Sequence, residues 1–232
     1  MNINSDFKER VVIDTNDMVW VLSPMPGVER KMLDRIGDEV ARATSLVRYA
    51  PNSSFSAHTH GGGEEFLVLE GVFNDATGSY PAGTYVRNPI GSSHAPWAGA
   101  EGATIFVKLH QFDQQDLTPS IINTKTQAWY QDLVPGLQVM PLHEFSTEHV
   151  ALVRWAPNTR FNPHQHWGGE EILVLEGVFC DEHGVYPKGS WIRSPHLSKH
   201  QPFTGPEGAL IYVKTGHLLQ IGVVAASSNS LC

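Results

Sequence analysis

The stretch from His58 to Phe73 reads HTHGGGEEFLVLEGVF, and the stretch from His164 to Phe179 reads HQHWGGEEILVLEGVF. Both stretches belong to a longer internal repeat. Residues 46–108 align with residues 152–214 at a constant offset of 106 and without a gap, and about 37 of the 63 aligned pairs are identical. Self-similarity of this extent within one chain indicates a duplicated domain.

The limits of the two copies follow from where the similarity ends. Upstream of the main match, Trp20 corresponds to Trp129 at an offset of 109, so the second copy is three residues shorter in a connecting loop. The polar stretch 111–126 contains the joint. We therefore predict a first domain over residues 1–110, a linker over residues 111–126 and a second domain over residues 127–232. Each domain then has about the 100 residues that a compact fold needs.

The secondary structure predicted for both copies is β. The chain contains 21 glycines and 15 prolines, which divide it into short runs rich in β-branched and aromatic residues, as in antiparallel sandwiches and barrels. Four apolar residues of the first copy do have helical spacing: Val28, Met32, Ile36 and Val40. Met32, however, aligns with Pro141, and a proline would break a helix interior. We therefore expect extended structure there as well.

Composition excludes several classes of function. A net charge of -8 argues against nucleic acid as a partner, because binding phosphates requires a basic face. The sequence has no run of about 18 apolar residues to span a membrane and no apolar signal segment at its start. Its two cysteines, Cys180 and Cys232, are too few for a disulfide framework. We expect a cytoplasmic protein with free thiols.

Each copy carries three histidines and one glutamate at the same spacing. His58 and His60 lie two residues apart, so in a strand they project from the same face. A glycine-rich turn then returns the chain to Glu64, and His94 follows 30 residues later. Imidazole nitrogens with one carboxylate suit zinc, iron, manganese, nickel or copper. The same four positions in the second copy are His164, His166, Glu170 and His200.

A single His-x-His pair is often only a surface feature. Here both copies retain all four residues, while neighbours such as Thr59 and Gln165 differ. We therefore predict one divalent metal ion in each copy, chosen from zinc, iron, manganese and nickel, with zinc and iron favoured. Glu65 and Glu171 are the alternative carboxylates, but strand alternation places them on the opposite face from Glu64 and Glu170.

Other polar residues have less definite roles. Arg87 and Arg193 either bring a positive charge near the metal or form surface ion pairs. Tyr80 and Tyr186 are expected to pack at a turn. Cys180 is expected to be a buried, inert thiol, with redox sensing as the alternative. Six histidines lack a counterpart in the other copy and are expected to be ordinary surface or core residues: His110, His143, His149, His183, His196 and His217.

With these motifs the chain resembles the cupin superfamily and, more closely, the ChrR-like cupins, the cupin domain type of the ChrR anti-sigma factors. The resemblance rests on residues 58–73, on the stretch YPAGTYVRNP from Tyr80 to Pro89, on His94 and on their repeat over residues 164–200. It implies an all-β fold of two tandem jelly-roll barrels with a metal inside each. In ChrR proteins the cupin accompanies a helical zinc-binding domain that holds a sigma factor. This sequence has no cysteine pair before the first copy, so a sigma factor bound by that route is not expected.

Two classes of function fit this reading. The first is a metal-binding regulatory protein related to ChrR, which senses oxidative stress or a small ligand. The second is a metal-dependent dioxygenase acting on a small carbonyl compound or diketone, since four protein ligands on an octahedral ion leave two positions open. No catalytic acid or base and no organic cofactor site stand out. A small molecule is the expected partner, and a homo-oligomer is compatible with the tandem barrels.

Overall fold

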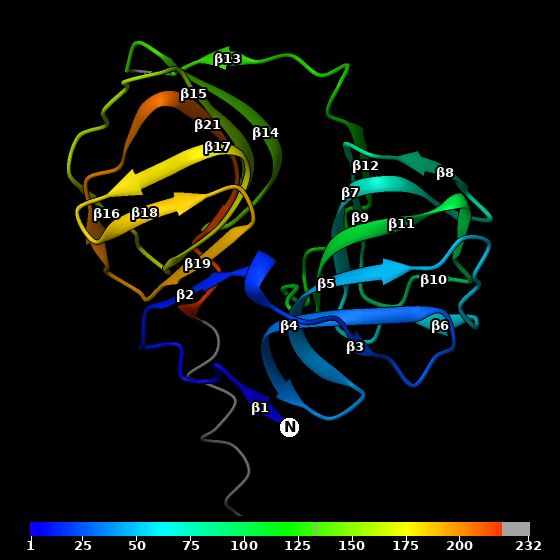
Figure 1. The fold of residues 1–232 in the computed structure, drawn as a ribbon. Helices are drawn as coiled ribbons and strands as arrows, with labels where there is room; N and C mark the ends of the chain where they lie inside the picture. Colours follow the sequence, from blue (N-terminus) through cyan, green and yellow to red (C-terminus); the bar gives the residue numbers. More distant parts are fainter. Residues whose placement is uncertain (133, 220–232) are drawn as a thin grey trace, which may run out of the picture. The chain divides into compact units, whose positions relative to one another are not determined.

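The structure is a computed structural model that describes residues 1–132 and 134–219. The chain forms two compact units, one built from residues 1–5 and 18–127 and the other from residues 6–17 and 128 onward. Both units consist of antiparallel strands, which curve around an interior in Figure 1. Helical structure within the described ranges includes a 3₁₀ turn at Thr15–Asp17, and no helix there has the length and apolar character of a membrane span.

The first unit has one nine-stranded sheet and a separate two-stranded ladder. Along the sheet the strands follow the order β1 (Asn2–Ile3), β4 (Val28–Gly37), β5 (Ala41–Tyr49), β11 (Trp97–Leu109), β7 (Glu64–Asp75), β9 (Thr84–Asn88) and β12 (Ser120–Asn123). Two further strands, β3 (Val21–Leu22) and β8 (Gly78–Pro81), pair with β4 and β7. The ladder joins β6 (His58–Thr59) to β10 (Ser93–His94).

The second unit repeats this arrangement with an eight-stranded sheet. Its order is β13 (Tyr130–Gln131), β14 (Leu137–Phe145), β15 (Glu148–Trp155), β21 (Phe203–Thr215), β17 (Glu170–Asp181), β19 (Ser190–Ser194) and β2 (Val11–Asp14). Strand β18 (Gly184–Pro187) pairs with β17, and the ladder joins β16 (His164–Gln165) to β20 (Lys199–His200). The two predicted all-β barrels are therefore present.

The strand that opens each repeat belongs to the barrel of the other repeat. Strand β2 pairs with β19, and β12, at the same place in the second repeat, pairs with β9. In both cases the threonine that follows the added strand donates a hydrogen bond to the neighbouring chain segment. The hydroxyl of Thr15 donates to the carbonyl of Gly189 at 2.7 Å, and that of Thr124 donates to the carbonyl of Gly83 at 2.6 Å. Without these additions β9 and β19 would expose an unpaired edge.

The structure thus divides the chain differently from the sequence-based boundaries. Residues 6–17, expected in the first domain, lie in the second unit. Residues 111–126, expected to form a linker, lie in the first unit and include the paired strand β12. The reason is physical: both segments contain short apolar strands that cover a sheet edge.

The segment with helical spacing is extended, as the alignment with Pro141 predicted. It forms strand β4, whose pairing with β5 shifts register between Met32 and Asp34. The pairing of β14 with β15 shifts between Pro141 and His143, at the same place in the repeat. A β-bulge is one of the few sites in a sheet that accept a proline, which has no N–H to donate. The bulge therefore accounts for the proline in the second copy.

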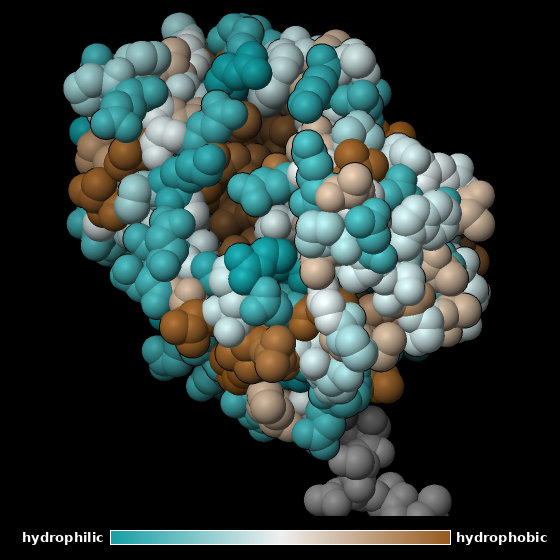
Figure 2. Space-filling model, turned by 45° about the vertical axis from the view of Figure 1, so that its right-hand side comes forward, coloured by the Kyte–Doolittle hydropathy of each residue, from teal (hydrophilic) through white to brown (hydrophobic). Residues whose placement is uncertain are grey.

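Apolar side chains fill the interior of each unit. Phe66 and Val68 of β7 lie two residues apart and so face the same interior. The first interior contains Val28, Val47, Tyr49, Phe66, Val68, Phe73, Val86, Ile105 and Val107, and the second contains Leu137, Trp155, Ile172, Val174, Phe179, Ile192 and Ile211. On the face drawn in Figure 2, hydrophilic residues predominate and hydrophobic residues gather in smaller patches.

Candidate metal centres

The two-stranded ladder positions the first and the third histidine of each set. In the first unit His58 pairs directly with His94 across β6 and β10, and His60 follows two residues after His58. The chain then turns through Gly63, which has φ of 77°, and enters β7 at Glu64. A Cβ added at Gly63 would overlap the ring of Phe112, so only glycine fits this turn. The turn brings Glu64 beside the histidines.

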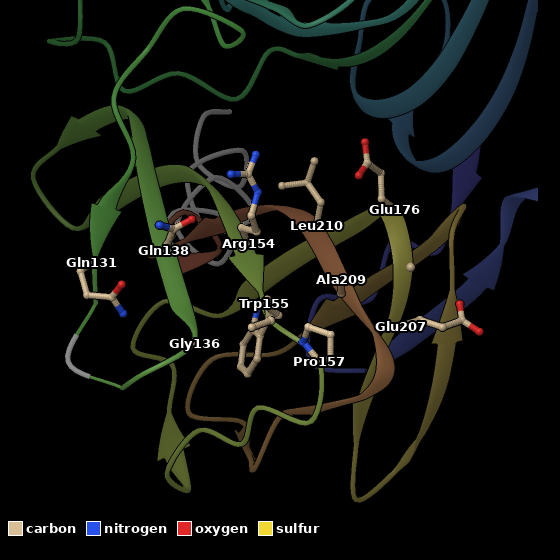
Figure 3. A pocket seen from close by; sticks show the side chains of 12 residues that line it. Gln131, Gly136, Gln138, Arg154, Trp155, Pro157, Glu176, Glu207, Ala209 and Leu210 are labelled. Atoms are coloured by element: carbon tan, nitrogen blue, oxygen red, sulfur yellow. The ribbon is translucent and has the colours of Figure 1, made fainter.

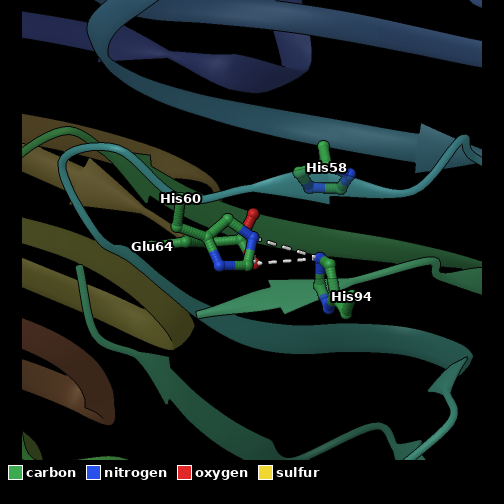
Figure 4. A group of neighbouring side chains, drawn as sticks. All are labelled: His58, His60, Glu64 and His94. Carbon is green, nitrogen blue, oxygen red and sulfur yellow. Dashed lines mark hydrogen bonds and ion pairs between the residues drawn. The ribbon is translucent and has the colours of Figure 1, made fainter. Parts of the chain in front are cut away.

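The four predicted residues of the first copy converge on one point (Figure 4). The Nε2 atoms of His60 and His94 are 3.3 Å apart, and Oε1 of Glu64 lies 3.5 Å from the first and 3.6 Å from the second. All four offer a ligand atom within 4.8 Å of the others. Neighbouring ligands of an octahedral ion with bonds of about 2.1 Å lie about 3 Å apart. The donor set therefore fits a transition-metal ion.

Hydrogen bonds at the outer nitrogens determine where the imidazole protons lie. Nδ1 of His58 donates to the Ser56 carbonyl at 2.9 Å, and Nδ1 of His94 faces the carboxylate of Asp75 at 3.1 Å. Ser92 donates its hydroxyl proton to the Pro89 carbonyl, so its oxygen accepts from Nδ1 of His60 at 2.9 Å. With the protons on Nδ1, all three Nε2 atoms present lone pairs to the same point. Facing lone pairs repel unless a cation lies between them.

The second unit brings three of its four predicted residues within the same limit: His164, His166 and His200. Nε2 of His166 lies 3.0 Å from Nε2 of His200. Oε1 of Glu170 is 3.4 Å from His166, and its Oε2 is 3.7 Å from His200. That Oε2 atom is buried and has no hydrogen-bond partner among the described residues. An orphaned buried carboxylate oxygen beside imidazole lone pairs is what a bound cation would satisfy.

Burial shifts the pKa of two of the histidines and of both glutamates in opposite directions. It lowers the pKa of His60 and of His166 to about 3, with further lowering from the neighbouring histidines, so both imidazoles are neutral. It raises the pKa of Glu64 and of Glu170 to about 7. Neutral imidazole is the form that binds metals, and a positive ion would favour the ionised carboxylate.

A second carboxylate supports one histidine of each centre, and sequence reasoning missed it. Asp75 holds Nδ1 of His94 at 3.1 Å, and Asp181 faces Nδ1 of His200 at 3.6 Å. The two tyrosines that were expected to pack at a turn donate hydrogen bonds to these carboxylates. The hydroxyl of Tyr80 donates to Asp75 at 2.9 Å. Tyr186 donates to Asp181 at 2.7 Å. The signal is present in both copies as the spacing D-x-x-G-x-Y-P.

The two arginines lie neither beside the metal centres nor at the surface. Arg87 is fully buried on the opposite face of the strands, where its Nη1 pairs with Oε2 of Glu65 at 2.8 Å. Arg193 is buried as well, with its guanidinium 4.1 Å from the ring of Phe7. The expectation of a cation near the site or of a surface ion pair was therefore wrong. Glu65, the alternative ligand, is held by Arg87 and by Tyr85, which donates to it at 2.7 Å.

Two of the unmatched histidines have structural roles in the second unit. His217 is buried against the carboxylate of Glu171. His196 accepts a hydrogen bond from the backbone N–H of Gly168 at 2.9 Å, within the turn that precedes Glu170. Cys180 is a free, buried thiol whose pKa is raised by burial, while Cys232 lies outside the described residues. A thiol of this kind is unreactive.

A pocket separate from the metal centres opens on the second unit (Figure 3). It has a volume of about 540 Å³. Gln138, Arg154, Leu210 and Glu176 form a row across four neighbouring strands at its wall. This row lies on the sheet face opposite to the core residues, so the pocket and the second metal centre lie on different faces. The guanidinium of Arg154 lies 4.1 Å from the ring of Trp129.

Comparison with known structures places the whole architecture among cupin proteins. A crystal structure of a putative dioxygenase from Nostoc punctiforme matches with a TM-score of 0.75 and 18% identity, over 91% of this chain and 84% of that one. A putative glyoxylate-induced protein from Pseudomonas aeruginosa matches with a TM-score of 0.71 and 15% identity, over 89% and 88%. An oxalate decarboxylase from Lactobacillus farciminis matches with a TM-score of 0.65 and 12% identity, over 94% and 90%. At these identities the likeness shows the fold.

The sequence itself carries the family relationship. No curated protein matches the chain significantly. The family model described as the ChrR cupin-like domain matches twice, over residues 8–113 and 118–219. Both matches contain the complete set of three histidines and one glutamate, and together they span most of the chain. The chain therefore belongs to the ChrR cupin-like family and carries two copies of its domain in tandem.

Proposed function

We propose that this protein is a metal-dependent dioxygenase with one ion in each barrel, acting on a small dicarbonyl compound. The observation that supports the proposal most is that in both units three histidines lie together with one buried glutamate beside them. His58, His60, Glu64 and His94 would hold the first ion, and His164, His166, Glu170 and His200 the second. A bound iron ion would supply open coordination positions and one-electron chemistry with dioxygen.

The overall reaction balances without a further reductant. One 1,3-dicarbonyl molecule and one dioxygen molecule give a carboxylic acid and a 1,2-dicarbonyl compound. One carbon–carbon bond breaks, the four electrons that reduce dioxygen come from the substrate, and both oxygen atoms remain in the products. The proposal therefore needs no nicotinamide or flavin site, in keeping with the absence of a recognisable motif for either in the sequence.

The side chains around each centre suit a small, weakly polar substrate. The ring of Phe55 lies 5.2 Å from that of His58, and the ring of Phe73 lies 6.2 Å from that of His94. Phe161 and Phe179 take the same places in the second unit, at 5.0 Å from His164 and 6.4 Å from His200. Apolar walls exclude water and leave the ion as the main polar partner of a substrate.

The two chambers differ at several aligned positions, among them Tyr49 in the first and Trp155 in the second. Trp155 has a buried indole N–H with no hydrogen-bond partner among the described residues. An unpaired donor inside an apolar chamber is suited to a substrate oxygen. We therefore expect the two barrels to prefer different substrates of the same class.

The free thiol of Cys180 fits the expected cytoplasmic location, because thiols stay reduced there.

The test is to load the protein with iron under nitrogen and add 2,4-pentanedione as the probe. We expect an optical change on binding, followed by uptake of one dioxygen per probe molecule when air is admitted. The control is the double variant His60→Ala/His166→Ala, which keeps the fold but loses one ligand in each barrel. An iron-loaded protein that binds the probe no better than this control would refute the proposal.

A regulatory role is the second candidate, and one observation favours it. The ladders that carry the outer histidines are only two residues long on each side, with His58 paired to His94 and His164 to His200. An ion that joins both strands would add much of the stability at this end of the barrel. Metal occupancy would then switch local order, as a sensor requires. A structural zinc ion, with no response to dicarbonyl probes, would favour this role.

A further inference from the structure

The two metal centres differ in what lies behind the supporting carboxylate. In the first unit one oxygen of Asp75 faces His94 at 3.1 Å, and the other accepts from the backbone and hydroxyl of Thr77 and from Tyr80. Among the described residues, His94 is the one side chain that can carry a positive charge within hydrogen-bond distance of Asp75. Asp75 therefore directs one oxygen at the metal-facing histidine alone.

In the second unit an arginine from the exchanged segment shares that oxygen. Arg10 lies immediately before strand β2, and its Nη2 donates to Oδ2 of Asp181 at 3.1 Å and to the hydroxyl of Tyr186 at 2.7 Å. The same Oδ2 atom faces Nδ1 of His200 at 3.6 Å, longer than the corresponding 3.1 Å in the first unit. The guanidinium and the imidazole therefore compete for one carboxylate oxygen.

The repeat shows that this contact is specific to the second centre. Val11 pairs with Arg193, and Ser120 pairs with Arg87 at the same place in the first unit. The residue that precedes Ser120, and thus occupies the position of Arg10, is Pro119. Proline has no side-chain donor, so the first centre has no equivalent of the Arg10 contact.

From this arrangement we infer that Arg10 is a positioning residue of the second metal centre, which acts through Asp181 and weakens the hold of His200 on the ion. A carboxylate that shares its oxygen with a guanidinium is a poorer acceptor for the imidazole Nδ1–H, and an imidazole with a weaker acceptor is a weaker metal ligand. The positive charge of Arg10 acts in the same direction on a cation. The second centre therefore binds its ion less tightly than the first and leaves the ion more electrophilic.

Arg10 is not needed to keep Asp181 in place. The other oxygen of Asp181 accepts hydrogen bonds from the backbone N–H groups of His183 at 2.8 Å and of Gly184 at 3.0 Å, and from the hydroxyl of Tyr186 at 2.7 Å. The exchanged segment is also held independently, by the pairing of β2 with β19 and by the Thr15 hydroxyl. Removal of the guanidinium thus frees Asp181 for His200 without releasing either element.

The inference rests on the proposed occupancy of the second centre, and the experiment measures that centre alone. In a His58→Ala/His60→Ala background, which disables the first centre, zinc affinity is measured by competition with a chromophoric chelator. We expect Arg10→Met to bind zinc about 10-fold more tightly than the background, within the range found for changes to outer-shell partners of metal ligands. Arg10→Lys, which keeps the positive charge, should lie between the two.

The sign of the change separates this role from a structural one. If Arg10 only anchored the N-terminal segment, Arg10→Met would weaken zinc binding and lower the melting temperature of the metal-free protein. Unchanged or weaker affinity in Arg10→Met would overturn the inference while leaving the proposed function intact. No zinc at the second centre of the background protein would overturn both. The matched control is Arg48→Met, since Arg48 pairs with Glu29 in the first unit; it should leave the second centre unchanged.

Discussion

His60 and His94 face each other through their Nε2 atoms at 3.3 Å, while Ser92 and Asp75 hold the protons on the opposite side of the two rings. This geometry leaves two lone pairs directed at one point, which only a cation stabilises. In the second unit the Nε2 atoms of His166 and His200 lie 3.0 Å apart. The metal sites can therefore be tested one at a time.

The first prediction concerns metal stoichiometry. His60→Ala removes one of the converging lone pairs and should reduce bound metal from about two equivalents to about one, because the second centre keeps all its ligands. Elemental mass spectrometry on protein purified without chelators measures this. His183→Ala, which removes an exposed histidine outside both centres, is the control and should retain two equivalents. Two equivalents in His60→Ala would show that the ligand assignment is wrong.

The second prediction concerns stability. Because an ion that binds only the folded protein stabilises it, metal at 100 times its dissociation constant should add about 2.7 kcal/mol for each site. Removal of the metal by a chelator should lower the melting temperature by several degrees, and its return should restore the original value. The double variant His60→Ala/His166→Ala should show neither change. A chelator effect of equal size in that variant would mean that the chelator acts elsewhere.

The third prediction tests the carboxylate behind His94. Asp75→Asn keeps the shape of the side chain but removes its charge, so Nδ1 of His94 loses a charge-assisted acceptor. We expect metal affinity at the first centre to fall by about 10- to 100-fold, with the second centre unaffected. Asp38→Asn, at an exposed carboxylate paired with the N-terminus, should change neither affinity. If Asp75→Asn bound metal at the first centre as tightly as Asp38→Asn does, Asp75 would have no role in metal binding.

The fourth prediction concerns the turn before Glu64. Gly63→Ala combines a positive φ with overlap on the ring of Phe112, so it should cost more than about 2 kcal/mol of unfolding free energy and lower metal affinity. Gly91→Ala is the matched control, since Gly91 also has positive φ, of 85°, but an added Cβ would meet no atom within 4 Å. That variant should lose only about 1 kcal/mol. Urea unfolding curves of the two metal-free variants give the comparison.

Much of this architecture could be predicted because the chain contains two copies of the same domain, which can be aligned with each other. Aligning Met32 with Pro141 excluded a helix, and the repeated histidines stood out against neighbours such as Thr59 and Gln165 that had changed. Strand alternation placed Glu64 and Glu65 on opposite faces, as in the structure, where Glu65 pairs with buried Arg87. These inferences use only local periodicity and the repeat.

What could not be predicted depends on contacts between distant segments. Asp75 lies 19 residues from His94 in sequence, and the repeated spacing D-x-x-G-x-Y-P does not indicate which distant side chain its carboxylate contacts. The pairing of β2 with β19 joins segments more than 170 residues apart, and the apolar pattern of Val11–Asp14 is compatible with either sheet edge. Arg87 was expected either beside the metal or in a surface ion pair, because arginines are seldom fully buried unless they are paired.

The exchanged strands also have consequences for dissection and ancestry. A cut between residues 110 and 119 would separate each half from the strand that completes its barrel, so either half alone would expose the edge of β9 or β19 and tend to aggregate. The two halves expressed together should rescue each other. A single-domain ancestor that traded its opening strand with a second copy would have been an obligate symmetric dimer, and tandem fusion would have turned that exchange into an intramolecular one. On this view the duplication preserved an existing assembly, and its first advantage was freedom for the two centres to diverge.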